Sequence, residues 1–167
     1  MTPLTTYEFE YADKHNIEEI LPCLYDILYS NMSIITPTGN TYEDDLKEWL
    51  SNIIPEMQKE PRRIVLMFAD NELIGYFKYY ICSDSLMMED IQIRKDHQRT
   101  GLFHLFYSWL VKKLPKSIKQ VEAYSNKSNY KSQGVLENLG LIRSGENKNG
   151  KSFYYKGDYA VLLQKYS

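Results

Sequence analysis

The stretch from Met88 to Phe106, MEDIQIRKDHQRTGLFHLF, decides the fold because its periodicity changes along its length. At its start, side chains of two kinds alternate, as in a strand with two unlike faces: Glu89, Ile91 and Ile93, and Asp90, Gln92 and Arg94. Residues 94–100 contain no apolar side chain. Apolar residues then recur at helical spacing after Gly101, at Leu102, Leu105, Phe106, Trp109 and Leu110. We expect a strand, a polar loop and a helix.

The loop before Leu102 has the features of an anion site. A helix N-terminus offers unpaired backbone N–H groups and the positive end of the helix dipole. The sequence Gln98-Arg99-Thr100-Gly101-Leu102-Phe103 resembles the pyrophosphate loop of the GNAT superfamily of acetyl-CoA-dependent N-acetyltransferases, Arg/Gln-x-x-Gly-x-Gly/Ala. Gln98 and Gly101 match, whereas Phe103 stands where the family has a small residue. By itself the motif also fits an ordinary helix start after a solvated loop.

Length and composition narrow the class of protein. The chain has 167 residues, 43% of them hydrophobic and 25% charged, and a net charge of -2, which is typical of a single soluble domain spanning residues 1–167. The charge pattern gives no sign of nucleic-acid binding, and no apolar run is long enough for a membrane helix. We therefore expect a cytoplasmic protein. Its state, monomer or homodimer, stays open.

The thiols and imidazoles suggest neither a disulfide nor a metal site. Cys23 and Cys82 lie far apart among apolar neighbours, which favours two buried, reduced thiols. The three histidines show no metal-ligand spacing. We expect no metal cofactor.

The remaining periodicities predict the other elements. A helix should begin after Asn16, with a kink or break at Pro22, and a second amphipathic helix should follow the cap residue Thr41. Gly140 should end a helix. The expected strands are 6–11, 63–69, 73–82, 119–124, 141–143 and 153–163, with turns at Asp70-Asn71 and Asn149-Gly150.

This element order is similar to that of the GNAT fold over nearly the whole chain. A second motif supports the resemblance, because Asn129-x-x-Ser132-x-x-x-Leu136-x-x-x-Gly140-Leu141 looks like the family's Asn-x-x-Ala-x-x-x-Tyr-x-x-x-Gly-Phe. Leu136 replaces the usual tyrosine. The fold class implied is α/β (α+β), with a mixed, mostly antiparallel central sheet flanked by about four helices.

The resemblance implies acetyl-CoA as cosubstrate and a set of residues that bind it. Backbone groups of the loop would hold the pyrophosphate, the strand would pair with the pantetheine arm, and Asn129 would bind the pantetheine amides or cap its helix. Arg94, Lys95 and Arg99 could contact phosphates or be solvated loop cations. The cofactor-binding candidates are Ile91, Gln92, Ile93, Gln98, Arg99, Thr100, Gly101, Leu102, Phe103, Asn129 and Ser132.

Acetyl transfer to an amine needs a neutral amine, a stabilised oxyanion and a protonated leaving thiolate. An alkylammonium has a pKa of about 10.4, so a base is useful. Glu89 is the first candidate, because Glu89-Asp90 resembles the Glu-Asp of some polyamine-acetylating members; a structural carboxylate is the alternative. Asp90, Glu122 and Tyr124 are the reserves. Leu136 cannot donate a proton, which leaves Tyr130, Tyr124 or water to protonate the thiolate.

The expected function is therefore acetyl transfer from acetyl-CoA to a primary amine of a small molecule or peptide. The acceptor is not identifiable, because the segments that should select it, 30–40 and 145–157, have no diagnostic charge pattern. The alternative is a nonenzymatic domain on the same fold that binds CoA or another small ligand.

Overall fold

The computed structural model describes residues 4–59 and 61–167, and the chain forms two compact units. One unit comprises Met1–Lys78 and Asp90–Leu102, and the other comprises Tyr79–Glu89 and Phe103–Ser167. The strands form a seven-stranded sheet in the order β1-β2-β3-β4-β5-β7-β6. Their bounds are β1 Tyr7–Tyr11, β2 Arg63–Ala69, β3 Glu72–Cys82, β4 Ser85–Ile93, β5 Gln120–Asn126, β6 Ile142–Glu146 and β7 Ser152–Asp158.

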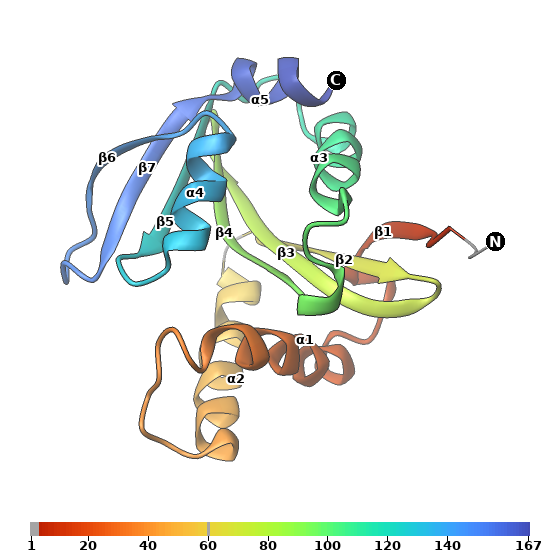
Figure 1. Ribbon diagram of the computed structural model, residues 1–167, viewed down its shortest axis with the longest axis vertical. Helices are drawn as coiled ribbons and strands as arrows, with labels where there is room; N and C mark the ends of the chain where they lie inside the picture. Colours follow the sequence, from red (N-terminus) through yellow and green to blue (C-terminus); the bar gives the residue numbers. More distant parts are fainter. Residues whose placement is uncertain (1–3, 60) are drawn as a thin grey trace. The chain divides into compact units, whose positions relative to one another are not determined.

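The helices of the first unit begin where the cap residues predict. The Asn16 side chain accepts a hydrogen bond from the Glu18 N–H at the start of α1 (Ile17–Met32), and Thr41 Oγ1 accepts one from the Asp44 N–H at the start of α2 (Tyr42–Lys59). Figure 1 shows α1 and α2 next to each other. Helix α1 continues through Pro22, so the expected irregularity is not a break; the ring removes only one N–H donor there, and a kink stays a prediction.

The core of the first unit lies between these helices and the strands. The apolar stripe of α2 packs on buried side chains from α1, β2 and β3. The buried members include Leu21, Leu24, Ile53, Leu66 and Tyr76. β1 pairs antiparallel with β2, from Tyr7–Ala69 to Tyr11–Val65, and Asp70 and Asn71 both take positive φ angles in the predicted turn before β3.

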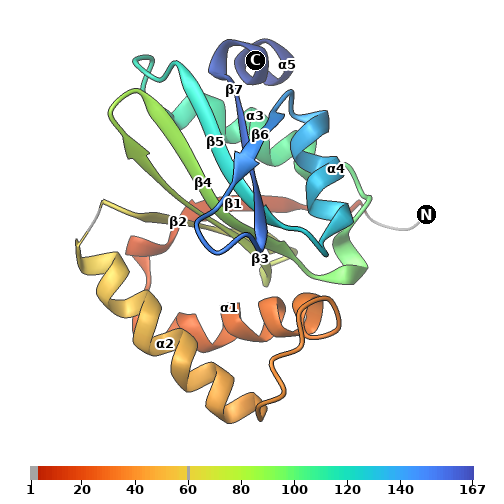
Figure 2. The ribbon, with the colours of Figure 1, turned by 90° about the vertical axis from the view of Figure 1, so that its left-hand side faces the viewer.

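The second unit is built on β5, which has a parallel neighbour and an antiparallel one. It pairs parallel with β4 from Ser85–Gln120 to Met88–Ala123 and antiparallel with β7 from Gln120–Asp158 to Asn126–Ser152. β6 completes the predicted hairpin with β7. Helix α4 (Tyr130–Asn138) contacts β5 and β6 (Figure 2), and Gly140, at φ 94°, follows its C-cap as expected.

The C-terminus corrects one predicted element. The strand expected over 153–163 ends at Asp158, and residues Tyr159–Tyr166 form helix α5. Tyr159, Leu162 and Tyr166 are its buried residues, which is a helical spacing rather than an alternating one. The Tyr166 ring packs on Tyr107 of α3 (Leu102–Lys113), with 5.2 Å between ring centroids. The described residues therefore contain five α-helices rather than about four.

The thiols correct another expectation. Cys23 and Cys82 are free, but both are exposed rather than buried. Cys23 follows the buried Leu21 and precedes the buried Leu24, yet each helical residue turns by about 100°, so it lies on another face of α1. In residues 4–59 and 61–167, no helix has the length and apolar character that crossing a bilayer requires.

Candidate functional site

The glycine loop has an unusual backbone just before α3. Gly101 has φ 83° and Arg99 has φ 61°, a left-handed conformation that costs a non-glycine residue roughly 1–2 kcal/mol. Turns of this type direct successive N–H groups into a concavity that suits an anion. The space beside Gly101 is open, since a Cβ there would meet no atom within 4 Å. The predicted anion site is therefore compatible with the backbone, and Leu102 begins the helix as expected.

Side chains brace this loop from both ends. Gln98 Nε2 donates to the Ile93 carbonyl oxygen at 2.8 Å, and Thr100 Oγ1 donates to the His97 carbonyl oxygen at 2.8 Å. The Tyr7 hydroxyl of β1 donates to Thr100 Oγ1 at 3.2 Å. A short 3-10 helix, Lys95–His97, occupies some of the segment that the sequence predicts as a polar loop. These bonds hold the loop conformation without any charged group.

In the last residues of β4, the backbone N–H and C=O groups of successive residues point to opposite edges of the strand. Arg94 N–H donates to Ile74 O of β3 at 2.8 Å, and Gln92 O also faces β3, because a Cβ at Gly75 would lie 2.6 Å from it. Ile93 O must then face the other edge. There it accepts hydrogen bonds from Gln98 Nε2 and from Asn31 Nδ2, the latter at 2.9 Å. This is the edge that the expected pairing of Ile91–Ile93 with a pantetheine arm would use.

The cations near the loop differ in what they contact. Arg94 is paired with Glu72 at 2.7 Å and with Asp96 at 2.8 Å, an ion-paired state that neither sequence interpretation anticipated, and a phosphate contact by this residue stays a prediction. Lys95 and Arg99 are exposed, as either of the two sequence interpretations allows.

Asn129, the first residue of the second motif, caps helix α4. Asn129 Oδ1 accepts a hydrogen bond from the Ser132 N–H at 3.1 Å, at the start of α4, so the cap alternative for Asn129 is observed. Leu136 is buried in α4 and Tyr130 is 79% exposed. Phe103, the departure from the family motif, is half-buried and stacks on Tyr107 with 6.0 Å between centroids. Its bulk is thus accommodated by an aromatic neighbour one helical turn away.

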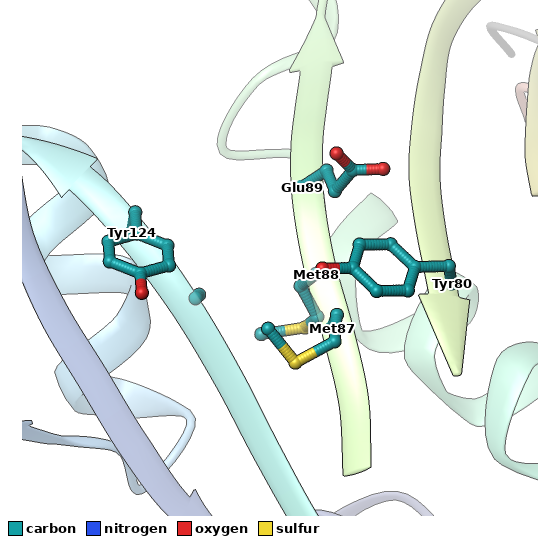
Figure 3. A pocket seen from close by; sticks show the side chains of 6 residues that line it. Tyr80, Met87, Met88, Glu89 and Tyr124 are labelled. Carbon is teal, nitrogen blue, oxygen red and sulfur yellow. The ribbon is translucent and has the colours of Figure 1, made fainter. Parts of the chain in front are cut away.

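The second unit contains a cavity of about 210 Å³ between side chains of three strands (Figure 3). It adjoins the point where the pairing of β4 with β5 ends, at Met88 and Ala123. Its walls are aromatic, thioether and methyl groups, with one carboxylate. The lining residues are Tyr80 of β3, Met87, Met88 and Glu89 of β4, and Ala123 and Tyr124 of β5. A cavity below about 300 Å³ suits a small group rather than a large ligand.

The reserve carboxylates are engaged in hydrogen bonds of their own. Asp90 accepts from the Tyr76 hydroxyl at 2.6 Å and from Gln92 Nε2 at 2.8 Å. Burial raises the pKa of Asp90, and these two bonds oppose that rise. The pKa of Tyr76 is well above its ordinary value because the phenol is buried beside this carboxyl group.

Glu122 is held on β5 by two hydroxyl groups. Ser85 Oγ donates to Glu122 Oε2, and the Tyr154 hydroxyl donates to Oε1. Both bonds lower the pKa of Glu122, while burial and the same carboxylate raise the pKa of Tyr154 to about 12. A carboxylate held ionised by two donors is a weak base. Of the residues that the sequence predicts to act in catalysis, only Glu89 and Tyr124 line the cavity.

The sequence analysis did not single out Asn31, Tyr80 or Met87, although Asn31 lies in the segment 30–40 that should select the acceptor. A signal for Asn31 was present in the sequence, since it follows Leu24 and Leu28 on the stripe of α1 at spacings of seven and three residues, where a polar residue is unusual. Its partners Gln92 and Ile93 lie more than sixty residues away, so the contact itself had no local signal. Tyr80 and Met87 belong to ordinary strand patterns, and nothing in the sequence around them indicated a binding site.

No protein-family model matches the chain, and no curated protein matches it in sequence. Solved structures match it in fold. The PaiA N-acetyltransferase of Thermoplasma acidophilum in complex with coenzyme A gives a TM-score of 0.66 at 18% identity, covering 92% of this chain and 99% of its own. PseH, an N-acetyltransferase of Campylobacter jejuni in complex with acetyl coenzyme A, gives 0.60 at 16% identity, with coverages of 92% and 99%. A Desulfovibrio desulfuricans protein of the GNAT family gives 0.67 at 13% identity, with coverages of 92% and 99%.

Proposed function

We propose that this chain, which has the fold of the GNAT acetyltransferases, transfers an acetyl group from acetyl-CoA directly to a primary amine. The observation that carries the proposal is the strained loop before α3, with positive φ at Arg99 and Gly101. Strain of this kind in a non-glycine residue persists where the surroundings enforce it, and it concentrates at ligand sites.

The loop residues fit the diphosphate of CoA in type and in shape. The backbone from Gln98 to Phe103 supplies N–H donors at a helix start, where anions are favoured. Gly101 leaves open space for the close approach of a ligand. Lys95 and Arg99 would add charge from exposed positions. Along the strand, Ile91, Gln92 and Ile93 would bind the arm of the cosubstrate, and Asn129 and Ser132 would contribute from the start of α4.

The acceptor is best matched to the cavity beside Glu89. A primary amine is an ammonium ion in water, and its favourable partners are a carboxylate and aromatic faces. Glu89, Tyr80 and Tyr124 supply these groups around one small space. Met87 and Met88 supply apolar contact for an alkyl chain. Small molecules with an exposed primary amine and flexible peptide N-termini both fit this description.

The two proton transfers each have a candidate residue. Acetyl-CoA, when bound, supplies an acetyl thioester. Glu89 takes one proton of the ammonium group, directly or through water, and the neutral amine attacks the thioester carbonyl carbon. The C–N bond forms as the C–S bond breaks, and the nitrogen releases a second proton to solvent as the amide forms. Tyr124, which lines the same cavity, is the donor that we propose for protonation of the leaving sulfur. Leu136 holds the place of the family's tyrosine and has no proton to give.

Two measurements test the proposal. Calorimetry of the wild-type protein with CoA and with acetyl-CoA should give saturable binding to one site. A panel of primary amines and short peptides should then include at least one that makes the protein consume acetyl-CoA and release free thiol. Absence of CoA binding would remove the proposal altogether.

The alternative function, a nonenzymatic binding domain, is separated by the same pair of measurements. It requires CoA binding without turnover over the whole amine panel. The carboxylate of Glu89 in the cavity lining favours the enzyme, because acetyl transfer to an ammonium group uses a general base, whereas binding of CoA alone does not.

A further inference from the structure

The side-chain amide of Asn31, in the last turn of α1, has hydrogen-bond partners for its nitrogen but none for its oxygen. Its Nδ2 donates to Ile93 O at 2.9 Å and to Gln92 Oε1 at 3.1 Å, which uses both of its N–H groups. Its Oδ1 is buried and has no hydrogen-bond partner; among the described residues it shares this state only with Ser125 Oγ. Buried polar atoms are nearly always paired. Asn31 therefore holds an acceptor ready for a donor that the described residues do not supply.

The orientation of this amide follows from its neighbours. Exchanging the oxygen and nitrogen would turn the oxygen toward Ile93 O and Gln92 Oε1, which are both acceptors, and the two hydrogen bonds would be lost. Gln92 is itself fixed, because its Nε2 donates to Asp90 Oδ1, and Asp90 accepts from Tyr76. Gln92 Oε1 and Ile93 O thus set the direction of Asn31 Oδ1, and Asp90 and Tyr76 extend the hydrogen-bond chain behind Gln92.

The position of Asn31 points to a substrate. Its amide lies at the edge of β4 that faces away from β3, beside the Ile93 carbonyl that also receives Gln98 from the glycine loop. Under the proposed function this edge carries the arm of the cosubstrate. Substrates of that reaction bring N–H donors to it, namely the amides of the pantetheine arm and the amine of the acceptor.

We propose that Asn31 is a substrate-binding residue whose Oδ1 accepts a hydrogen bond from an N–H group of a substrate bound along this edge of β4. The inference rests on the proposed function and adds to it a residue from α1. The donor chemistry is shared by the pantetheine amides and the acceptor amine, and the experiment distinguishes these sources.

Nuclear magnetic resonance of the protein labelled with ¹³C and ¹⁵N at asparagine gives the direct test, with the Asn31 signals assigned by their loss in Asn31→Leu. A new hydrogen bond to Oδ1 should move the ¹³Cγ resonance downfield. Movement on addition of CoA alone assigns the donor to the pantetheine arm. Movement only after n-butylamine is added to the CoA complex assigns it to the acceptor. A resonance that stays in place with both ligands overturns the inference.

Affinity gives the second test, measured for whichever ligand moves the resonance. Asn31→Leu should weaken binding about tenfold, as the loss of one hydrogen bond predicts. The matched control is Tyr76→Phe, which disturbs the same hydrogen-bond chain but keeps the Asn31 amide, and it should change affinity by less than about threefold. Equal losses in both variants would mean that Asn31 acts only by ordering the strand, contrary to the inference. Wild-type protein that binds no CoA fails the proposed function, whereas CoA binding with an unmoved Asn31 fails this inference alone.

Discussion

Glu89 differs from the other candidate bases in where its carboxylate lies. Glu89 lines the cavity, whereas Asp90 and Glu122 are not among its lining residues. Replacing it with Gln keeps the size of the side chain and removes the base. Since general-base assistance contributes about two to four powers of ten, Glu89→Gln should lower kcat/KM at least tenfold with acetyl-CoA affinity nearly unchanged.

The pH dependence of the Glu89→Gln defect separates catalysis from a structural role. The defect should shrink as pH rises, because solvent then supplies neutral amine without help from the protein. Steady-state kinetics from neutral to alkaline pH, with an acceptor from the amine panel, make the measurement. A variant with the wild-type rate and pH profile would make Glu89 a structural carboxylate and move attention to Tyr124.

The hydrogen bonds of Glu122 lead to a separate prediction, about the free energy of unfolding. Its pKa is lowered in the folded protein by Ser85 and Tyr154, so its contribution to the free energy of unfolding is present above the ordinary value of 4.5 and is lost as pH falls through the lower folded value. At pH 7, Glu122→Gln should be less stable than wild type by about 1–2 kcal/mol. Urea unfolding at pH 7 and near pH 3 should show the difference shrinking at acid pH.

The control for Glu122 is its neighbour Tyr124. Tyr124→Phe removes a hydroxyl group close to Tyr154 but leaves both donors to Glu122 in place, and should keep the wild-type dependence of stability on pH. Tyr154→Phe removes one donor and should raise the pKa of Glu122 in a carboxyl titration. A Glu122→Gln protein with wild-type stability at both pH values would contradict the assignment.

Among the elements, the glycine loop depends on backbone conformation more than on side chains. A β-branched residue at φ 83° must either adopt a strain of about 1–3 kcal/mol or change the loop. Gly101→Val should therefore weaken CoA binding by at least tenfold in calorimetry, with a folded circular dichroism spectrum. Gly134→Ala in α4 is the control, since its added Cβ also meets open space but the helix favours Ala over Gly by about 0.5–1 kcal/mol. Equal affinity in the two variants would exclude the loop as the diphosphate site.

Some secondary-structure elements could be predicted from the sequence alone and others could not. The strand, loop and helix around Gly101 were predictable because each has its own period and because Gly101 follows a run of polar residues. Helix α5 was not, since a Tyr-rich segment suits a strand as well as a helix; the decisive contact, Tyr166 with Tyr107, joins residues far apart in the chain. The same limit hid Asn31, whose partners lie on β4. Local patterns placed the elements, and tertiary contacts decided which side chains meet.

For the molecule as a whole, the thiols of Cys23 and Cys82 give a test that covers both compact units, because each unit contains one of them. Both are free and exposed, so a thiol reagent should count two groups in the native protein without denaturant or reductant, and the same two after unfolding in urea. Neither residue belongs to the glycine loop or lines the cavity. Alkylation of both with iodoacetamide, verified by mass, should consequently leave CoA affinity within about twofold of the untreated protein. A native count below two would contradict the exposure of these side chains, and loss of CoA binding after alkylation would place a thiol beside the ligand.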